Sequence, residues 1–355
     1  MSAEPVMTLW LSASALLWVL ALGGIFLLLP RWTRSGLAFA VSVRPGFLAT
    51  PRGREILKRY RRGVLIATLL TGAGWVAVVE LAPHLIGGAH LLLLPELAAF
   101  TAVYLRARRA SLPHAVVHAA PPPAVPGRIP LPGGWLGQTA PFALLAGASA
   151  WILSRMGSLP ERIPIHYGTD LEADRWVAPT WPHLLGLPLV GVATCGAILL
   201  MSWAMSRSTR AATDARQGEM LRLTLRILLG SSLMVAGLFG GVSLLALRGA
   251  EQLDPLVLVA IILVPEAAGL VLLIWVLLRF SRLRSSSQVA VGDRTDDRFW
   301  KAGLVYFNPD DPTLFVEKRF GIGYTMNMAR PASWWLLGAL VLFPLLVVLL
   351  LELLG

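Results

Sequence analysis

The sequence predicts an all-α polytopic membrane protein, and three observations support that fold class. Of the 355 residues, 56% are hydrophobic and only 14% are charged, and the mean hydropathy is +0.67. Soluble domains contain about 45–50% apolar and about 25% charged residues. Apolar stretches of membrane-spanning length recur along the chain, and basic residues gather between them. Because one span needs roughly 20 mostly apolar residues, we expect about eight transmembrane helices.

The eight expected spans share an apolar composition and a length close to the thickness of the hydrocarbon core. They are about Leu9–Leu29, Val64–Leu81, Leu85–Leu105, Gln138–Met156, His183–Met205, Arg226–Leu247, Leu256–Leu278 and Ser333–Leu353. Because proline ends helices readily, the few residues around Pro83 favour a tight hairpin between the second and third spans.

Four basic clusters set the expected orientation. They lie within Arg31–Arg62, Arg106–Arg109, Arg207–Arg222 and Arg279–Arg284. With eight spans all four clusters fall on one side, and Lys and Arg mark the cytoplasmic side of a membrane protein. We therefore expect both termini on the outer side. The net charge of +11 is explained by these flanking residues, so no nucleic-acid partner is expected.

The water-facing segments divide the chain. Residues 1–137 contain three spans, a basic connection with an expected surface helix near Arg54–Arg62, and a proline-rich linker over 110–137. Residues 138–205 contain the fourth and fifth spans with an outer loop over 157–182, and residues 206–284 contain the next two. Residues 285–332 are expected to form a small cytoplasmic domain before the last helix over 333–355.

Two similar segments predict an internal repeat. The third span contains LLLLPEL around Pro95–Glu96, and the seventh contains IILVPEA around Pro265–Glu266. Upstream of each, REILKRYRRGVL (Arg54–Leu65) is similar to GEMLRLTLRILL (Gly218–Leu229). The pattern suggests a two-fold 4+4 parallel repeat, an arrangement that occurs in transporters. Chance similarity between apolar segments is the alternative.

Glu96 and Glu266 are the sharpest intramembrane signal in the expected spans. A carboxyl group there is costly unless it is protonated, paired or solvated, so it normally faces the bundle interior. One hypothesis is a paired acidic site for a proton, a cation or an amine. The other is that each neutral acid bonds to a backbone carbonyl freed by the preceding proline and stabilises a kink.

The outer loop contains LPERIPIHYGTDLEADRW, the most distinctive polar stretch of the chain. Pro160 and Pro164 favour a stiff, extended segment that presents His166. His166, Asp174 and Trp176, with Asp170 nearby, are the candidate ligand-binding residues; the alternative is that they only hold the loop on its helices. No metal is expected, because no ligand spacing typical of a metal site occurs among the outer His, Asp and Glu residues: His84, His90, His166, His183, Glu80, Asp170 and Asp174.

The cytoplasmic segment 296–329 is expected to contain a β-hairpin. Leu304–Phe307 and Leu314–Val316 are short apolar runs, and the NPDDP sequence between them is typical of a turn. We expect this hairpin at the membrane face, with Lys318 and Arg319 contacting anionic lipid headgroups or a partner. Two glycines alone do not predict a nucleotide site, and no cofactor is expected.

Two stretches resemble known families. Leu159 to Trp176 resembles the LPxxIPxHxxxxGxxDxW motif of a family of multi-spanning bacterial membrane proteins, a motif that also occurs in SdpI-type proteins conferring immunity to a secreted peptide toxin. The matching residues are Leu159, Pro160, Ile163, Pro164, His166, Asp174 and Trp176, whereas Leu171 stands where the family has glycine. Trp300 to Asn327 resembles a small C-terminal domain of unknown function found in the same kind of protein. The resemblance implies a bacterial inner-membrane protein without implying a reaction.

Three functions fit these features. The first is a non-enzymatic protein that binds a peptide, toxin or envelope ligand through the outer loop, for immunity or signalling. The second is a secondary transporter that uses Glu96 and Glu266. The third is a membrane enzyme for a lipid-linked substrate, in which His166 and Asp174 converge with Glu80 and His84. The expected partners are the lipid bilayer, anionic headgroups at the cytoplasmic face and a peptide or protein ligand outside, and the sequence does not indicate an oligomeric state.

Overall fold

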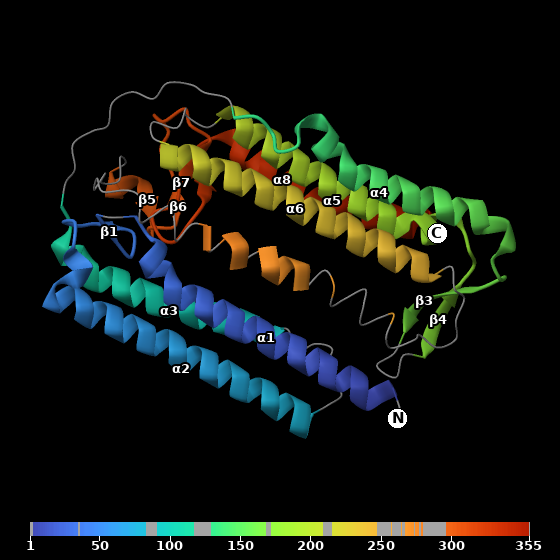
Figure 1. Ribbon diagram of the computed structural model, residues 1–355, viewed down its shortest axis with the longest axis horizontal. Coiled ribbons are helices and arrows are strands. Elements are labelled where there is room, and N and C mark those ends of the chain that lie inside the picture. The colour runs from blue at the N-terminus through green and yellow to red at the C-terminus, as the bar shows by residue number, and fades with distance from the viewer. Residues whose placement is uncertain are drawn as a thin grey trace. The chain divides into compact units, whose positions relative to one another are not determined.

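The computed structural model is mostly helical (Figure 1). It describes residues 3–34, 36–82, 91–116, 129–167, 172–208, 215–246, 257, 264, 267–272, 274–276, 278–279 and 296–354. Contacts divide the chain into two compact units: unit 1 comprises Met1–Glu4, Ala124–Arg279 and Arg330–Gly355, and unit 2 comprises Pro5–Pro123 and Phe280–Ala329. The last part of unit 2 is thus separated in sequence from its three N-terminal helices.

Within the described ranges, six helices are long and apolar enough to cross a membrane. They are α1 (Ala3–Trp32), α2 (Pro51–Leu81), α4 (Gly134–Arg155), α5 (Trp181–Ser208), α6 (Ala215–Ala246) and α8 (Pro331–Leu354). This supports a multi-pass membrane protein, but neither the expected count of eight nor the 4+4 repeat is confirmed. The expected third span corresponds in part to α3 (Leu93–Ser111), whose 19 residues include Glu96, Arg106, Arg108 and Arg109. In the expected seventh span the structure describes residues 257, 264, 267–272, 274–276 and 278, and its second half contains a shorter apolar helix, Ala267–Val276.

The expected surface helix at Arg54–Arg62 is instead the beginning of α2. Pro51 occupies the first turn, and the Thr50 hydroxyl accepts a hydrogen bond from the Gly53 backbone N–H at 3.1 Å. Both features start a helix, because proline needs no hydrogen-bond acceptor there and a hydroxyl satisfies an unpaired N–H. The helix then continues without a break into its apolar half, so one element carries both the basic residues and the span.

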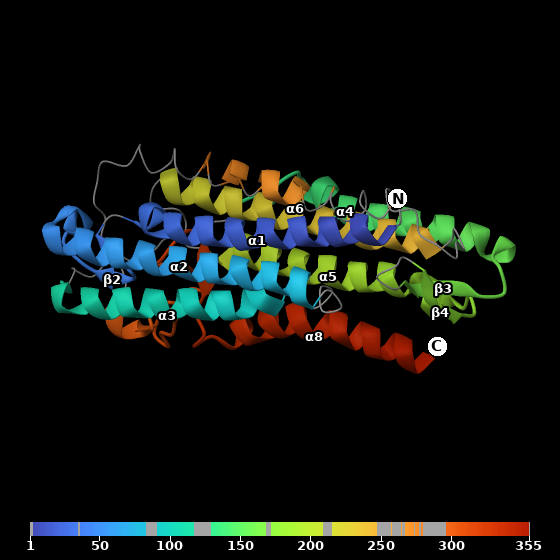
Figure 2. The ribbon, with the colours of Figure 1, turned by 90° about the horizontal axis from the view of Figure 1, so that it is seen from below.

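In unit 2, α1, α2 and α3 lie side by side, and short strands gather at one end of them (Figures 1 and 2). A buried core there joins the helices to β1 (Leu37–Ala38), β2 (Val41–Ser42) and Phe320. The Phe320 ring centroid lies 4.6 Å from that of Tyr104, on α3, and 6.3 Å from that of Tyr60, on α2. Packed aromatic rings bury large apolar areas, so this cluster makes the strand-bearing end one structural piece.

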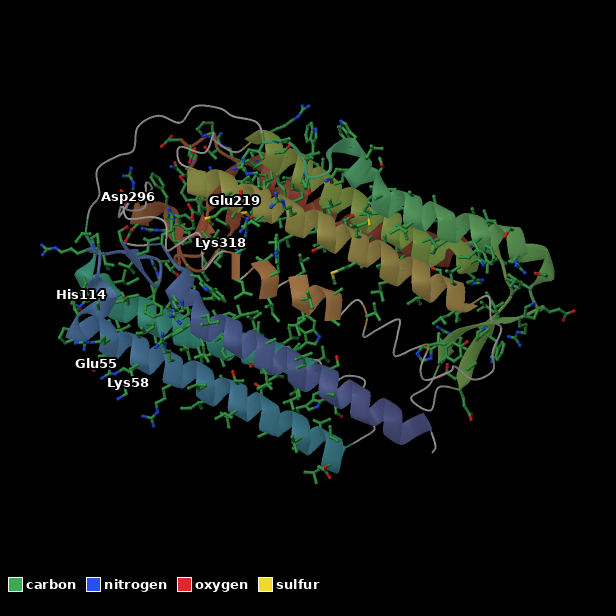
Figure 3. All side chains as sticks on the ribbon, viewed as in Figure 1. Glu55, Lys58, His114, Glu219, Asp296 and Lys318 are labelled. Carbon is green, nitrogen blue, oxygen red and sulfur yellow. The ribbon has the colours of Figure 1, made fainter. Side chains whose placement is uncertain are left out.

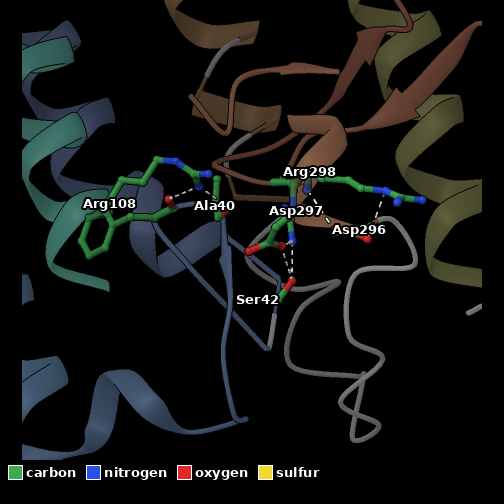
Figure 4. A network of polar contacts seen from close by, with 8 residues as sticks. Ala40, Ser42, Arg108, Asp296, Asp297 and Arg298 are labelled. Carbon is green, nitrogen blue, oxygen red and sulfur yellow. Dashed lines mark hydrogen bonds and ion pairs between the residues drawn. The ribbon is translucent and has the colours of Figure 1, made fainter. Parts of the chain in front are cut away.

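Side chains of α3 hold two hairpin turns. Phe39 and Ala40 connect β1 to β2 with φ of 49° and 61°, the positive φ values that two-residue type I′ turns require. The Arg108 guanidinium donates a hydrogen bond to the Ala40 carbonyl at 2.6 Å (Figure 4). The Tyr104 hydroxyl donates at 2.9 Å to the carbonyl of Ala302, in the second turn. These bonds offset part of the strain that positive φ imposes on non-glycine residues.

The second turn needs glycine at position 303. It connects β5 (Trp300–Lys301) to β6 (Val305–Tyr306), and Gly303 has a φ of 75°. A Cβ atom there would lie 2.6 Å from the Ala40 Cβ and 2.7 Å from the Tyr104 hydroxyl oxygen. The two turns therefore contact each other over α3 with no room for a side chain at this position.

The expected pairing of Leu304–Phe307 with Leu314–Val316 is wrong. In the structure β6 pairs with β5, and β7 (Phe315–Glu317) pairs with β8 (Tyr324–Met326). A bridge from Tyr306 to Asn327 joins the two hairpins in parallel. The segment between β6 and β7 thus links two hairpins instead of closing one.

A buried polar network explains the residues of this linking segment. The Asn327 side-chain amide donates to the carbonyls of Asn308 and Asp311 at 2.8 and 3.0 Å, and its oxygen accepts from the Asn308 N–H at 3.0 Å. The Tyr306 hydroxyl donates to the Asp311 carboxylate at 2.9 Å and accepts from the Asn308 amide at 3.0 Å. Because buried polar groups must be satisfied, these residues fix the linking segment to β6 and β8.

Unit 1 is a bundle of α4, α5, α6 and α8, with a two-stranded hairpin at one end (Figure 1). Leu145, Cys195 and Ala236 form a buried core between α4, α5 and α6. The single cysteine is therefore enclosed among apolar side chains, in agreement with its position in an apolar run. The bundle carries the hairpin that follows α4 and precedes α5.

Candidate functional site

The predicted ligand-binding residues lie on an antiparallel hairpin made of β3 (Ile163–Tyr167) and β4 (Ala173–Val177). Ile163 is fully buried and packs with Ile152 of α4 and Leu184 of α5. Val177, at the other end of the register, packs against the same cluster. The base of the hairpin is thus anchored on two helices of unit 1, and its outer part extends from that anchor.

Two irregularities in the register place His166 beside Asp174. Pro164 pairs with Trp176 and His166 pairs with Arg175, so Ile165 of β3 has no paired residue on β4. Tyr167 then pairs with Ala173, so Asp174 of β4 has no paired residue on β3. Such bulges change the direction of side chains in a hairpin. Ile165 is 43% exposed, so the expected packing of both isoleucines on the helix ends occurs only at Ile163.

The His166 imidazole contacts the Asp174 carboxylate, with 2.6 Å between Nδ1 and Oδ1. The two side chains are 65% and 54% exposed. An exposed ion pair contributes at most about 1 kcal/mol to folding, because water screens it. The pair is therefore a weak contribution to stability but a defined arrangement of an imidazole and a carboxylate at the surface.

Trp176 bonds to its own strand instead of to the pair. Its indole N–H donates to the Ala173 carbonyl at 3.2 Å, and its carbonyl accepts from Arg162 at 3.1 Å. Next to His166, Tyr167 is half-buried, and desolvation raises the pKa of its phenol. The Trp176 indole is thus engaged with the backbone of the hairpin, and Tyr167 is a partly desolvated phenol that follows His166 in sequence. Asp170, the fourth predicted ligand-binding residue, lies outside the described residues.

Another outer histidine, His183, does not join this pair. His183 lies in the first turn of α5, where its Nδ1 is 2.9 Å from the Thr180 hydroxyl and 3.0 Å from the Ala178 carbonyl. Glu80 lies near the end of α2, in the other unit, and His84 and His90 lie outside the described residues. Among the residues that the structure describes, no group of three or more His, Cys, Asp or Glu residues could hold a metal ion.

Glu96 lies inside unit 2. The residue is 1% exposed, and in the described part of the chain neither of its carboxylate oxygens makes a hydrogen bond of ordinary geometry, although the Thr68 side chain lies near enough to interact with the carboxyl group. Pro95 and Glu96 occupy the first turn of α3, so the proline lies near the beginning of the described helix instead of in its middle. The predicted kink is therefore not needed to explain this proline. Glu266 and Pro265 lie outside the described residues.

Arg319 does not face the lipid. It is 0% exposed, and its guanidinium donates to the Ser42 hydroxyl and to the Asp297 carboxylate. The Ser42 hydroxyl in turn donates to the same carboxylate at 2.7 Å (Figure 4). The guanidinium carbon lies 5.6 Å from the centre of the Trp300 ring. A buried charge requires such partners, so the predicted headgroup contact at Arg319 is wrong. Its neighbour Lys318 is exposed, although partial desolvation lowers the pKa of its ammonium group.

Comparisons with known proteins locate two short domains in the chain. Residues 142–192 match the family model described as a domain of unknown function, DUF1648, and residues 309–334 match that of a family of unknown function, DUF5808. No curated protein and no solved structure matches the chain. The first match covers most of α4, the whole hairpin and the first part of α5. With the six candidate spans, the matches fit a membrane protein family of unknown function.

Proposed function

We propose that this protein is a multi-pass membrane protein that binds an extracytoplasmic peptide or protein ligand through the β3–β4 hairpin. His166, Asp174 and Trp176 form the recognition surface, and Asp170 stays a predicted member of it that lies outside the described residues. The observation that carries the proposal is the exposed His166–Asp174 pair on a hairpin whose base is buried. An arrangement that contributes little to folding yet is held in one geometry is typical of a binding surface.

The chemistry of the pair suits a peptide. Asp174 engages Nδ1 of His166 and thereby orients the ring, which leaves Nε2 for a ligand. Among the described residues the sheet consists of β3 and β4, so each strand has an outer edge whose backbone groups can pair with an extended chain. A peptide that adds to one edge would place its side chains next to the imidazole and the indole.

The proposed location is the bacterial inner membrane, with the hairpin and both termini on the outer side. The basic residues of α2 and the end of α3 support this orientation, because positive residues stay on the cytoplasmic side. The similarity of the hairpin sequence to the motif of SdpI-type proteins favours immunity to a secreted peptide as the biological role, with signalling as the alternative.

The test uses a displayed library of random peptides selected against the full-length protein in lipid nanodiscs. We expect peptides that bind the wild-type protein and lose at least about tenfold in affinity to His166→Ala and Asp174→Asn, because each change removes a charge-assisted contact. Glu161→Gln is the matched control, since it removes an exposed charge next to the hairpin. Equal binding to all four proteins, or no selected peptide at all, would contradict the proposal. Thermal unfolding of each variant shows whether lost binding reflects lost folding.

A secondary transporter is the second candidate, and the burial of Glu96 favours it. A buried carboxyl group without a hydrogen-bond partner is costly, and such groups in membrane proteins mark proton and cation pathways. In proteoliposomes with an internal pH indicator, proton flux that is abolished by Glu96→Gln would support transport. Absence of flux from the wild-type protein under an imposed pH gradient counts against proton transport. The enzyme hypothesis stays a prediction, because it needs His84, which lies outside the described residues.

A further inference from the structure

A second candidate site lies between α2 and α3, inside unit 2. The structure has a pocket of about 320 Å³ there, formed where the first turns of α2 lie beside the last turns of α3. This volume is near the lower end of the range of about 300–1,000 Å³ that small-molecule sites occupy. Neither the hairpin proposal nor the predicted headgroup contacts of Lys318 and Arg319 involve these residues.

The inner part of the pocket is apolar. Ile56 and Tyr60 of α2 and Ala107 of α3 line it and are 3%, 1% and 6% exposed. At the same lining, a Cβ atom on Gly63 would lie 2.8 Å from the Val103 Cγ2, so the two helices are in close contact there. Small residues let helices approach closely. The helices therefore close the pocket at the Gly63–Val103 contact.

The outer part of the pocket is basic. Arg52, Arg59 and Arg106 line it together with a single acid, Glu55. Glu55 forms ion pairs with Arg52 at 2.7 Å and with Arg59 at 2.5 Å, so it holds both guanidinium groups in place. Figure 3 shows Glu55 at this end of α2. Arg106 forms no ion pair with any residue that the structure describes, and it is exposed.

A pocket with an apolar inner part and a basic outer part suits a ligand that is both anionic and amphipathic. Three guanidinium groups around one carboxylate leave an excess of positive charge, and guanidinium groups bind phosphate oxygens in pairs. The apolar interior excludes a fully hydrated ion but suits a hydrocarbon segment. The same helix continues into a candidate span, so the basic residues lie where a membrane helix enters the headgroup layer.

We propose that the α2–α3 pocket is a specific site for an anionic phospholipid. Arg52, Arg59 and Arg106 bind its phosphate group, and the apolar surface around Ile56 and Tyr60 receives the adjoining glycerol and acyl carbons. The site differs from general attraction of lipids to positive residues, because three guanidinium groups line the same pocket as an apolar surface. It is independent of the ligand that the hairpin binds.

Native mass spectrometry of the delipidated protein tests the proposal, with phosphatidylglycerol, phosphatidylcholine and glycerol 3-phosphate as probes. We expect one tightly bound phosphatidylglycerol, and about tenfold weaker binding to Arg106→Gln, because a hydrogen bond to a charged group is lost. Ala110→Leu fills the pocket without changing charge and should weaken binding by a similar factor. Arg61→Gln is the matched control, since Arg61 is an exposed residue of α2 outside the pocket.

Each alternative gives a different result. If Arg61→Gln weakens binding as much as Arg106→Gln, the attraction is general and the proposal is wrong. If glycerol 3-phosphate binds as tightly as phosphatidylglycerol, the pocket is a site for a soluble anion instead. If Ala110→Leu has no effect while remaining folded by circular dichroism, the apolar interior takes no part, which also contradicts the proposal. Binding of phosphatidylcholine equal to that of phosphatidylglycerol would rule out selection for negative charge.

Discussion

At the scale of single residues, neighbouring positions differ sharply in environment. Lys318 and Arg319 are adjacent basic residues, yet Lys318 is exposed and Arg319 is enclosed with Asp297 and Ser42. The guanidinium has five donors and keeps its charge when buried, which suits an enclosed ion pair better than an ammonium group does. The strand-bearing end of unit 2 therefore depends on one residue of the pair and not on the other.

We expect Arg319→Ala to lower the free energy of unfolding by about 3 kcal/mol, because it leaves Asp297 without its buried partner. Lys318→Ala, the adjacent control, should change it by less than about 0.5 kcal/mol. Thermal unfolding in detergent measures both. Equal destabilisation by the two changes would show that the burial of Arg319 is not what stabilises this end.

Replacing Glu96, in contrast to replacing Arg319, is expected to stabilise the protein. Because its buried carboxyl makes no hydrogen bond of ordinary geometry in the described part of the chain, Glu96→Leu is expected to raise the unfolding temperature. The free energy of unfolding should rise by about 1–3 kcal/mol, which is the cost of leaving a buried polar group unsatisfied. A lower unfolding temperature would mean that the carboxyl contributes to packing, and the transport hypothesis would lose its main support.

At the scale of elements, the β3–β4 hairpin separates an anchoring residue from an exposed one. Ile163 and Ile165 have the same side chain two positions apart, but the bulge after Pro164 leaves Ile163 buried and Ile165 exposed. Regular alternation would have placed both on one face. The bulge thus lets the same strand contact the helices at its start and present polar groups at its end.

Ile163→Ala is expected to destabilise unit 1 by about 2–5 kcal/mol, since it opens a cavity beside Ile152 and Leu184. Ile165→Ala is the matched control and should cost less than about 1 kcal/mol, because the side chain already contacts water. Chemical unfolding of the two variants measures the difference. A larger loss for Ile165→Ala would be incompatible with the register described above.

At the scale of the whole molecule, the chain forms two compact units from segments that are not continuous in sequence. Residues 296–329 complete the core at the strand-bearing end of α1, α2 and α3, although a long stretch of chain separates them. The Gly321 N–H donating to the Thr33 hydroxyl at 3.0 Å is one such contact. Loss of the C-terminal segment would therefore uncover the core of the N-terminal helices.

The proposed topology can be tested by labelling single cysteines with a membrane-impermeant maleimide. Cys195 is fully buried, so it should give little background. Glu161→Cys is expected to react in spheroplasts, whereas Arg109→Cys should react only after permeabilisation, because the hairpin is placed outside and the basic end inside. The reverse pattern would invert the proposed orientation and place the hairpin in the cytoplasm.

The sequence by itself determined the properties that depend on composition and on nearby residues. Apolar length predicts membrane spans because transfer into hydrocarbon sums over a helix. The sequence also located the loop in which His166 and Asp174 meet. The signals were its two prolines, the separation of eight positions between the two residues and the resemblance of the loop to a family motif. The sequence did not determine the number of spans, since α3 combines an apolar stretch with four charged residues.

Only the tertiary structure decided which distant groups meet. Arg319 is buried because Ser42, 277 positions away, and Asp297 lie beside it, and no local pattern contains that information. The partners of β6 and β7 were likewise set by the Asn327 network and not by the turn between them. The α2–α3 pocket arises from residues that are ordinary on each helix alone. The physical reason is the same in each case: hydrogen bonds, ion pairs and cavities depend on non-local contacts, whereas hydropathy and helix-starting signals act over a few residues.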